Sequence, residues 1–313
     1  MENILKKKLL IVSFFIMAAI NSIADDLIKP IPLHTVTNSK KSILGKQLFL
    51  DPRLSKNDTI SCQSCHNLAY GGADSGAVSL GVGGKSGTLN SPTVFNASYN
   101  LAQFWDGRAK NLKAQAAGPI TNPVEMGSTK ESVVKKLSKD SNYQKLFKEI
   151  YPEGISIDTI SDAIAEFEKT LLTPNARFDK YLRGNLTILT KKEKEGFELF
   201  RSRGCIACHN GVNIGGNMYQ RFGVFAQYKD RQNTQGRYSV THKEEDKYYF
   251  KVPTLRNIEK TAPYFHDGSA KTLDDAVQKM AYYQLGRKLS KDEIEKIVSF
   301  LHTLTGELPK NGQ

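Results

Sequence analysis

Several common features are scarce in this sequence. Outside residues 9–20 no apolar run approaches the length of a membrane span, which excludes a protein with several transmembrane helices. The formal net charge is +12, but no dense run of Lys and Arg follows the first residues, so a nucleic-acid-binding protein is not expected. Strand patterns are also few, which leaves a mainly α fold.

The chain has only four cysteines, and all of them lie in one pattern that occurs twice. Residues 62–66 read C-Q-S-C-H and residues 205–209 read C-I-A-C-H. C-x-x-C-H is the attachment signature of a c-type haem, because thiols at i and i+3 reach both vinyl groups of one porphyrin and the histidine ligates the iron. Two copies therefore predict two covalently attached c-type haems, held by Cys62, Cys65, His66, Cys205, Cys208 and His209.

Other uses of these cysteines fit the pattern less well. A Cys₄ zinc site would not need a histidine directly after each pair. A thioredoxin-like CxxC would sit in a βαβ pattern, and none surrounds either copy. Two disulfides are conceivable in an exported protein, but the repeated spacing argues against them.

The first 24 residues have the pattern of a secretory signal peptide. Lys6, Lys7 and Lys8 form a basic start, residues 9–20 are largely apolar, and Ser22 and Ala24 supply small residues for cleavage. An uncleaved anchor is the alternative. Because c-type haem is attached outside the cytoplasm, we expect the periplasm as the compartment and no membrane span after cleavage.

The remaining chain is an internal duplication. Residues 90–112 recur at residues 251–273 with an offset of 161, so that Asn96 matches Asn257 and Phe104 matches Phe265. We predict two cytochrome-c-like domains, residues 25–184 and 185–313, each with one covalently attached c-type haem.

Apolar periodicity predicts helices that begin near Ser42 and that cover residues 130–150 and 157–172. Capping boxes predict helix starts at Thr190 and Ser290. The Gly- and Ser-rich residues 71–87 predict a loop beside the first haem.

Specific motifs then point to a family. They are L-G-K-Q-L-F (44–49), D-P-R-L-S (51–55), N-S-P-T (90–93), Q-F-W-D-G-R (103–108), V-P-T-L-R-N (252–257) and A-P-Y-F-H-D-G (262–268). With the two CxxCH motifs, the chain resembles the bacterial di-haem cytochrome c peroxidases, which are related to the MauG-type enzymes. The resemblance implies reduction of hydrogen peroxide with electrons from a small c-type cytochrome or cupredoxin. The net positive charge would then steer an acidic redox partner.

The resemblance also implies the roles of individual residues. The haem at His66 would be peroxidatic, with Glu125 as acid/base and Gln115 as a hydrogen-bonding partner of peroxide. Trp105, the only tryptophan, would carry the electron between the haems. Met280 would be the second ligand of the haem at His209 and would raise its potential.

A calcium ion and a homodimer are further implications of the resemblance. The positions that match the calcium ligands are the Asn90 side chain and the carbonyls of Thr261 and Pro263, and oxygen donors suit Ca²⁺. The chain departs from the family at Val82, which stands where most members carry a histidine that occupies the peroxidatic iron in the oxidised enzyme.

Two other functions stay open. A di-haem electron carrier would need neither Glu125 nor Gln115. A MauG-like oxidase that modifies a partner protein would have tyrosine in place of Met280, and Tyr282 and Tyr283 lie nearby in the sequence.

Overall fold

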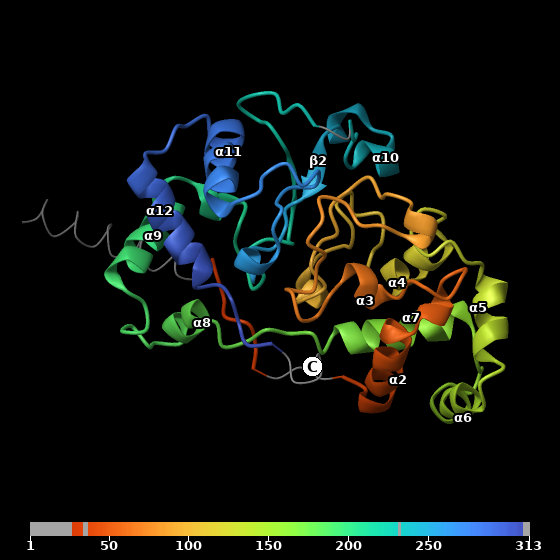
Figure 1. Cartoon of the computed structure of the whole chain (residues 1–313). Coiled ribbons are helices and arrows are strands. Elements are labelled where there is room, and N and C mark those ends of the chain that lie inside the picture. Colours follow the sequence, from red (N-terminus) through yellow and green to blue (C-terminus); the bar gives the residue numbers. More distant parts are fainter. Residues whose placement is uncertain (1–26, 34–36, 231–232, 309–313) are drawn as a thin grey trace, which may run out of the picture.

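Two groups of helices lie side by side in the structure (Figure 1). The computed structural model describes residues 27–33, 37–230 and 233–308. The predicted signal peptide lies outside these residues. In the described part, no helix combines the length and the apolar character needed to span a membrane.

Each group has its own set of helices. The first group contains α2 (Ser39–Leu50), α3 (Cys62–Cys65), α4 (Leu112–Thr121), α5 (Lys130–Leu137), α6 (Ser141–Ile150) and α7 (Ile157–Glu168). The second contains α8 (Arg177–Leu182), α9 (Lys191–Ser202), α11 (Leu273–Leu285) and α12 (Lys291–His302). The structure also has the short helix α10 (Tyr238–Thr241), a two-stranded antiparallel sheet, β1 (Tyr219–Arg221) with β2 (Tyr249–Lys251), and several single 3-10 turns. The fold is mainly α, as predicted.

The same close helix crossing organises both groups. α2 crosses α7 at Gly45, where an added Cβ would lie 1.9 Å from the carbonyl oxygen of Ala163. α9 crosses α12 at Gly196, where an added Cβ would lie 1.9 Å from the carbonyl oxygen of Lys296. Both glycines begin the same pattern, G-x-x-L-F, at residues 45–49 and 196–200, and they mark the two places where only glycine lets the backbones approach this closely.

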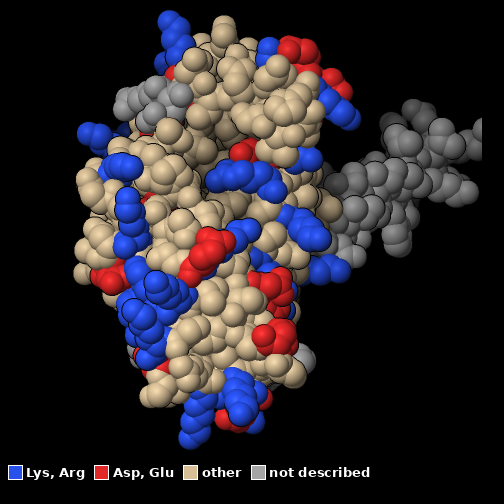
Figure 2. Space-filling model, turned by 90° about the vertical axis from the view of Figure 1, so that its right-hand side faces the viewer, with Lys and Arg blue, Asp and Glu red and all other residues tan. Residues whose placement is uncertain are grey.

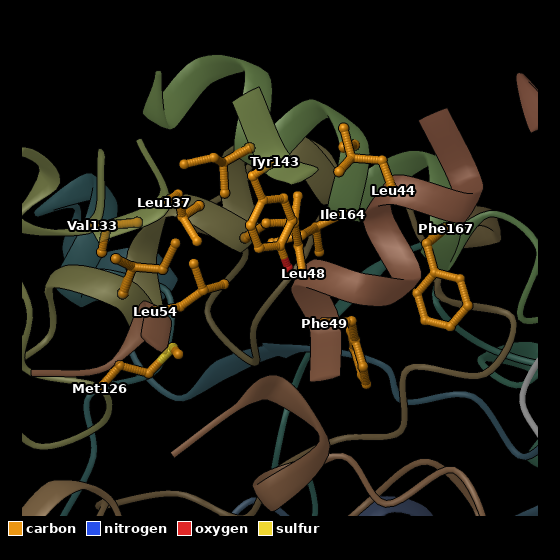
Figure 3. Close-up of a cluster of buried hydrophobic side chains, with 14 of the residues drawn as sticks. Leu44, Leu48, Phe49, Leu54, Met126, Val133, Leu137, Tyr143, Ile164 and Phe167 are labelled. Atoms are coloured by element: carbon orange, nitrogen blue, oxygen red, sulfur yellow. The ribbon is translucent and has the colours of Figure 1, made fainter. Parts of the chain in front are cut away.

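The first core lies between α2, α6 and α7 (Figure 3). Leu44 and Leu48 of α2 face Ile164 of α7, and Phe49 packs edge-on against Phe167 with ring centroids 5.3 Å apart. Met126 joins the same core from the loop after α4. This packing fixes both the helix that leads to the first CxxCH and the turn that carries Glu125.

The second core is built around Phe178, Phe197 and Phe300. The Phe178 ring lies 4.8 Å from that of Phe197 and 5.0 Å from that of Phe300. The predicted domain boundary at residue 184 stays a prediction, but the side chain of Phe178 packs with the C-terminal group rather than with the first. Ile28 packs there too.

Two helix predictions need correction. Residues 130–150 form two helices rather than one, because the Asp140 carboxylate accepts hydrogen bonds from the amides of Asn142 and Tyr143 and caps a new helix. The helix expected over 157–172 ends at Glu168. The capping boxes at Thr190 and Ser290 are confirmed.

The duplication is visible in the backbone. Asn96 and Asn257 both adopt positive φ angles (59° and 58°), and so do Phe104 and Phe265 (67° and 72°). The side chains of Asn96 and Asn257 each donate a hydrogen bond of 2.8 Å to the hydroxyl of Thr173. The two copies therefore meet at one buried threonine.

Charged side chains of both signs are interspersed on one face of the molecule. On the face drawn in Figure 2, lysine and arginine side chains are spread from top to bottom with acidic side chains among them. This distribution agrees with the absence of a dense basic run from the sequence.

Candidate active site

The first CxxCH forms a single helical turn, α3, with His66 at its end. The imidazole Nδ1 atom of His66 is buried and has no hydrogen-bond partner among the described residues. Burial lowers the pKa of this imidazole, which keeps it neutral. A neutral imidazole has the lone pair that an iron ligand needs.

The thiols do not have the character of redox or zinc-binding cysteines. None of the four cysteines forms a disulfide. Burial raises the pKa of the Cys62 thiol and raises that of Cys205 to about 11, whereas a reactive CxxC needs a lowered pKa. Among the described residues, no group of three or more His, Cys, Asp and Glu side chains could hold a metal ion.

Glu125 lies close to the first motif, in the predicted turn after the helix that carries Gln115. Burial raises the pKa of the Cys65 thiol, and the charges of Asp74 and Glu125 add to that shift, while the hydroxyl of Ser79 opposes it. The carboxylate of Glu125 is thus near enough to Cys65 to act on it electrostatically. Met126, the next residue, is buried in the first core and anchors the turn.

Two polar groups hold the Glu125 carboxylate. Asn122 Nδ2 donates a hydrogen bond of 2.7 Å to Glu125 Oε1. Burial raises the pKa of Glu125, and the charge of Arg108 and the Asn122 hydrogen bond act in the opposite direction. Arg108 is itself stacked 3.5 Å over the ring of Phe104. A carboxyl group whose pKa is raised by burial and that keeps a hydrogen-bond partner has the chemistry of a general acid/base.

The loop that carries Val82 is bound to the Glu125 turn. The Val82 amide donates a hydrogen bond of 2.7 Å to the Glu125 carbonyl, and Lys85 Nζ donates one of 3.1 Å to the Pro123 carbonyl. An added Cβ on Gly81 would lie 2.2 Å from the Val124 carbonyl oxygen. The predicted loop is confirmed apart from one 3-10 turn at Val82–Gly84, and it packs closely against the backbone of the Glu125 turn.

Gln115 lies in α4 and is partly buried, in the same segment that leads to Glu125. The structure shows no hydrogen bond that fixes its side chain among the described residues. Its role toward peroxide stays a prediction.

The second CxxCH borders a mainly apolar cavity with a volume of about 220 Å³. His209 lines it, and its Nδ1 atom lies 3.4 Å from the Ile214 carbonyl oxygen, which orients the ring. Burial lowers the pKa of His209 to about 4, so this imidazole is neutral as well.

Met280 of α11 lines the same cavity as His209. Neither Tyr282 nor Tyr283 is among the residues that line this cavity in the described chain. The side chain that the helix presents to the second haem site is therefore the methionine rather than a tyrosine.

Trp105 connects the two halves. It belongs to the first copy of the repeat, yet its side chain lines the cavity of the second haem site. Its indole Nε1 donates a hydrogen bond of 2.8 Å to the Asn90 carbonyl, and its ring lies 6.1 Å from that of His266. His266 is its counterpart in the repeat, so the two equivalent positions face each other at the junction.

The three positions matched to calcium are all found in the lining of one cavity. Asn90, Thr261 and Pro263 all line the cavity beside Trp105. They offer one amide oxygen and two backbone carbonyls, which is the donor chemistry that Ca²⁺ accepts. The residues fit the ion, and water or other oxygen donors would complete its coordination.

Sequence analysis missed several charged or polar groups at these sites. Asn122 and Arg108 act on Glu125, and Arg108 could have been noticed because it ends the F-W-D-G-R motif. Lys251 lines the cavity beside the second CxxCH, and burial lowers its pKa to about 8. Glu168 is buried near Cys62, and burial raises its pKa to about 8. The local sequence around Lys251 and Glu168 does not indicate that these side chains are buried.

Comparison with known proteins decides the family. A family model described as di-haem cytochrome c peroxidase matches residues 39–187, and a cytochrome c model matches residues 193–305. The chain is 52% identical to the cytochrome c551 peroxidase of Nitrosomonas europaea, over 91% of this chain and 86% of that protein. The chain belongs to the di-haem cytochrome c peroxidase family. The peroxidase of Pseudomonas aeruginosa is 43% identical, over 93% of this chain and 88% of that protein.

MauG proteins are more distant relatives of this peroxidase. The methylamine utilization protein MauG of Methylorubrum extorquens is 32% identical over 89% of this chain and 82% of that protein. A crystal structure of a MauG-like protein associated with microbial copper homeostasis has a TM-score of 0.78 at 27% identity, covering 90% of this chain and 93% of that one. This peroxidase is a haem enzyme that acts on peroxide, and the MauG-like and carrier alternatives have less support.

Proposed function

We propose that this enzyme reduces hydrogen peroxide in the periplasm through two covalently attached c-type haems. Its electrons would come from a small c-type cytochrome or cupredoxin. The observation that carries the proposal is the partly buried carboxylate of Glu125, which Asn122 holds and whose turn is bonded to the loop after the first CxxCH, in one chain with a tryptophan that lines the cavity at the second CxxCH.

Four thioether bonds and two histidines would hold the haems. Cys62, Cys65 and His66 would hold the peroxidatic one, and Cys205, Cys208, His209 and Met280 would hold the electron-transfer one. When bound, the haem at His66 supplies an iron with an open position at which the O–O bond of peroxide can be broken.

Glu125 would then act as the general acid/base. Its carboxylate would take a proton from one peroxide oxygen and return it to the other oxygen, which would leave as water. Two electrons and two protons from outside complete the conversion of one peroxide to two waters. Gln115 would orient the peroxide by a hydrogen bond, and Asn122 keeps the carboxylate in place.

Trp105 would carry electrons between the two halves of the molecule. Its support is the indole hydrogen bond to Asn90, which holds the ring against the second cavity. Met280 would give the electron-transfer haem a high potential, suited to a donor of high potential.

A calcium ion bound by Asn90, Thr261 and Pro263 would stiffen this junction. The Asn90 amide donates a hydrogen bond of 2.8 Å to the His266 carbonyl, so that ordering Asn90 also orders both aromatic rings beside it. We further expect export by a signal peptide over residues 1–24 and assembly into a homodimer.

Steady-state peroxide reduction tests the proposal. The dihaem protein is isolated from the periplasmic fraction, and oxidation of a reduced c-type cytochrome is followed after addition of peroxide. Saturable, peroxide-dependent oxidation supports the proposal. A protein that exchanges electrons with the cytochrome but consumes no peroxide would instead be a carrier, and one that modifies a partner protein without consuming cytochrome would be MauG-like.

A further inference from the structure

A series of aromatic rings in contact leads from Trp105 to the surface of α11. The Trp105 ring lies 6.1 Å from that of His266, and the His266 ring lies 6.0 Å from that of Tyr228. Tyr228 is 5.1 Å from Tyr283, and Tyr283 is 5.0 Å from Tyr282. Rings this close are in van der Waals contact, which favours electron transfer between them.

The tyrosine in the middle of the series has a proton acceptor. A phenol that loses an electron must also lose its proton to form a neutral radical. The Tyr228 hydroxyl donates a hydrogen bond of 2.8 Å to Asp267 Oδ2, and Asp267 is buried. Ser269 is also in contact with this hydroxyl. The carboxylate can therefore take the proton when Tyr228 is oxidised and give it back when Tyr228 is reduced.

The last ring is accessible. Tyr282 has 53% of its surface exposed, so its phenolic proton can leave directly to water. The described lining of the second cavity includes none of these three tyrosines. The ring series therefore leaves the cavity after His266, which lines it together with Trp105, and continues through the three tyrosines outside it.

We propose that this ring series carries oxidising equivalents from Trp105 to Tyr282 when no electron donor is present. One electron passes from Tyr282 through Tyr283 and Tyr228 to oxidised Trp105, and the Tyr282 proton goes to water. Peroxide supplies two oxidising equivalents, so each molecule of peroxide reduced to two waters can produce two tyrosyl radicals at the surface. The tyrosyl radical at the exposed Tyr282 would oxidise a phenol or a similar one-electron reductant.

This inference rests on the proposed role of Trp105 but has its own test. The dihaem enzyme is mixed with a few equivalents of hydrogen peroxide without cytochrome, in the presence of a nitroso spin trap, and the adducts are located by mass spectrometry of peptides. We expect the main adduct on Tyr282. Tyr228→Phe and Tyr283→Phe each keep a ring in place but remove the oxidisable phenol, and each should lower the Tyr282 adduct about tenfold or more.

Two controls separate the relay from simple exposure. Tyr70 is more exposed, at 71%, and lies outside the series, so an exposure-driven reaction would label it at least as strongly as Tyr282. Equal labelling of Tyr70, or a Tyr282 adduct that persists in both variants, would overturn the relay. Cytochrome-supported turnover should be unchanged in Tyr282→Phe, Tyr283→Phe and Tyr228→Phe. If the unsubstituted enzyme showed no cytochrome-supported peroxide turnover, the proposed function itself would be refuted.

Discussion

At the scale of single residues, the first haem site depends on one carboxyl group held between opposing influences. Burial favours the protonated form of Glu125, while Arg108 and Asn122 favour the ionised form. Without burial, it would be too weak a base.

Replacement of Glu125 tests its role directly. Glu125→Gln keeps the size and the hydrogen-bonding capacity of the side chain but removes the proton-accepting group. We expect peroxide turnover to fall by roughly 10²-fold or more, the usual scale for general acid/base groups, with unchanged haem content. The exposed Glu131 of α5 serves as the matched control, because Glu131→Gln should leave turnover unaffected. Near-normal turnover of Glu125→Gln would remove Glu125 from the mechanism.

Met280 is the residue that sets the second site apart. Met280→His should keep the haem low-spin but lower its midpoint potential, because an imidazole replaces the thioether. Oxidation of a high-potential donor should then be lost. A potentiometric titration followed by visible spectroscopy measures this. Met218, whose carbonyl accepts a hydrogen bond from Val252 but which does not line the described cavity, supplies the control Met218→Leu. If Met218→Leu shifts the potential and Met280→His does not, the ligand has been misassigned.

At the scale of elements, the loop 79–87 is fixed in contact with the Glu125 turn. The Gly87 amide donates to the Ser79 carbonyl, and the Gly81 amide donates to the Lys85 carbonyl, so the loop closes on itself. Val82, which is buried at its tip, has no lone pair in its side chain and cannot ligate iron. The arrangement places an inert side chain where most family members have a histidine.

Val82 in this loop leads to a prediction about the oxidised enzyme. We expect the peroxidatic haem to be open, or bound only by water, in both redox states. Electron paramagnetic resonance of the fully oxidised protein should show one high-spin haem, and turnover should begin without a lag and without prior reduction. A bis-histidine signal, or activity that appears only after one-electron reduction, would show that another residue occupies the iron.

The helix crossings lead to a prediction about stability. Gly196→Ala places a methyl group against the Lys296 carbonyl and forces α9 away from α12. We expect the free energy of unfolding to fall by about 1–3 kcal/mol, the usual cost of overpacking. Chemical denaturation of the dihaem protein measures it. Gly118 of α4 is a helical glycine with room for a Cβ, 3.5 Å from Phe104, so Gly118→Ala should cost nothing. Equal effects of the two substitutions would mean that the crossing is not tight.

At the scale of the whole molecule, the two halves are joined through buried polar groups as well as through the haem junction. Thr173 lies on the segment between α7 and α8 and accepts hydrogen bonds from one asparagine of each repeat. Its amide also donates to Asn96 Oδ1, and the Gly306 amide donates to Asn257 Oδ1. The segment between α7 and α8 thus binds both repeats through Thr173.

Removal of the threonine hydroxyl should weaken this joint. Thr173→Val leaves the side-chain amides of Asn96 and Asn257 without their acceptor in a buried place, so we expect a loss of about 1–3 kcal/mol in the free energy of unfolding. Thermal unfolding should show it as a lower Tm. Thr187 is exposed, and Thr187→Val is the matched control. An unchanged Tm for Thr173→Val would indicate that water replaces the hydroxyl there.

The sequence by itself determined the chemistry that depends on local spacing. C-x-x-C-H requires only that neighbouring residues in one turn face one porphyrin, and the capping boxes at Thr190 and Ser290 depend on residues three positions apart. The duplication could be recognised because the matching residues occur in the same order in both copies. The helix break at Asp140 was missed because apolar periodicity continues across it, whereas the cap is decided by a side-chain hydrogen bond.

Only the tertiary structure decided what distant segments do together. That Phe178 packs with the C-terminal core, that Trp105 of one repeat enters the cavity of the other, and that Thr173 binds both asparagines depends on how the two groups of helices pack. The ring series from Trp105 to Tyr282 joins residues more than 170 positions apart. Burial and contact of this kind arise from the sum of many long-range packing interactions, and no local pattern of residues encodes them.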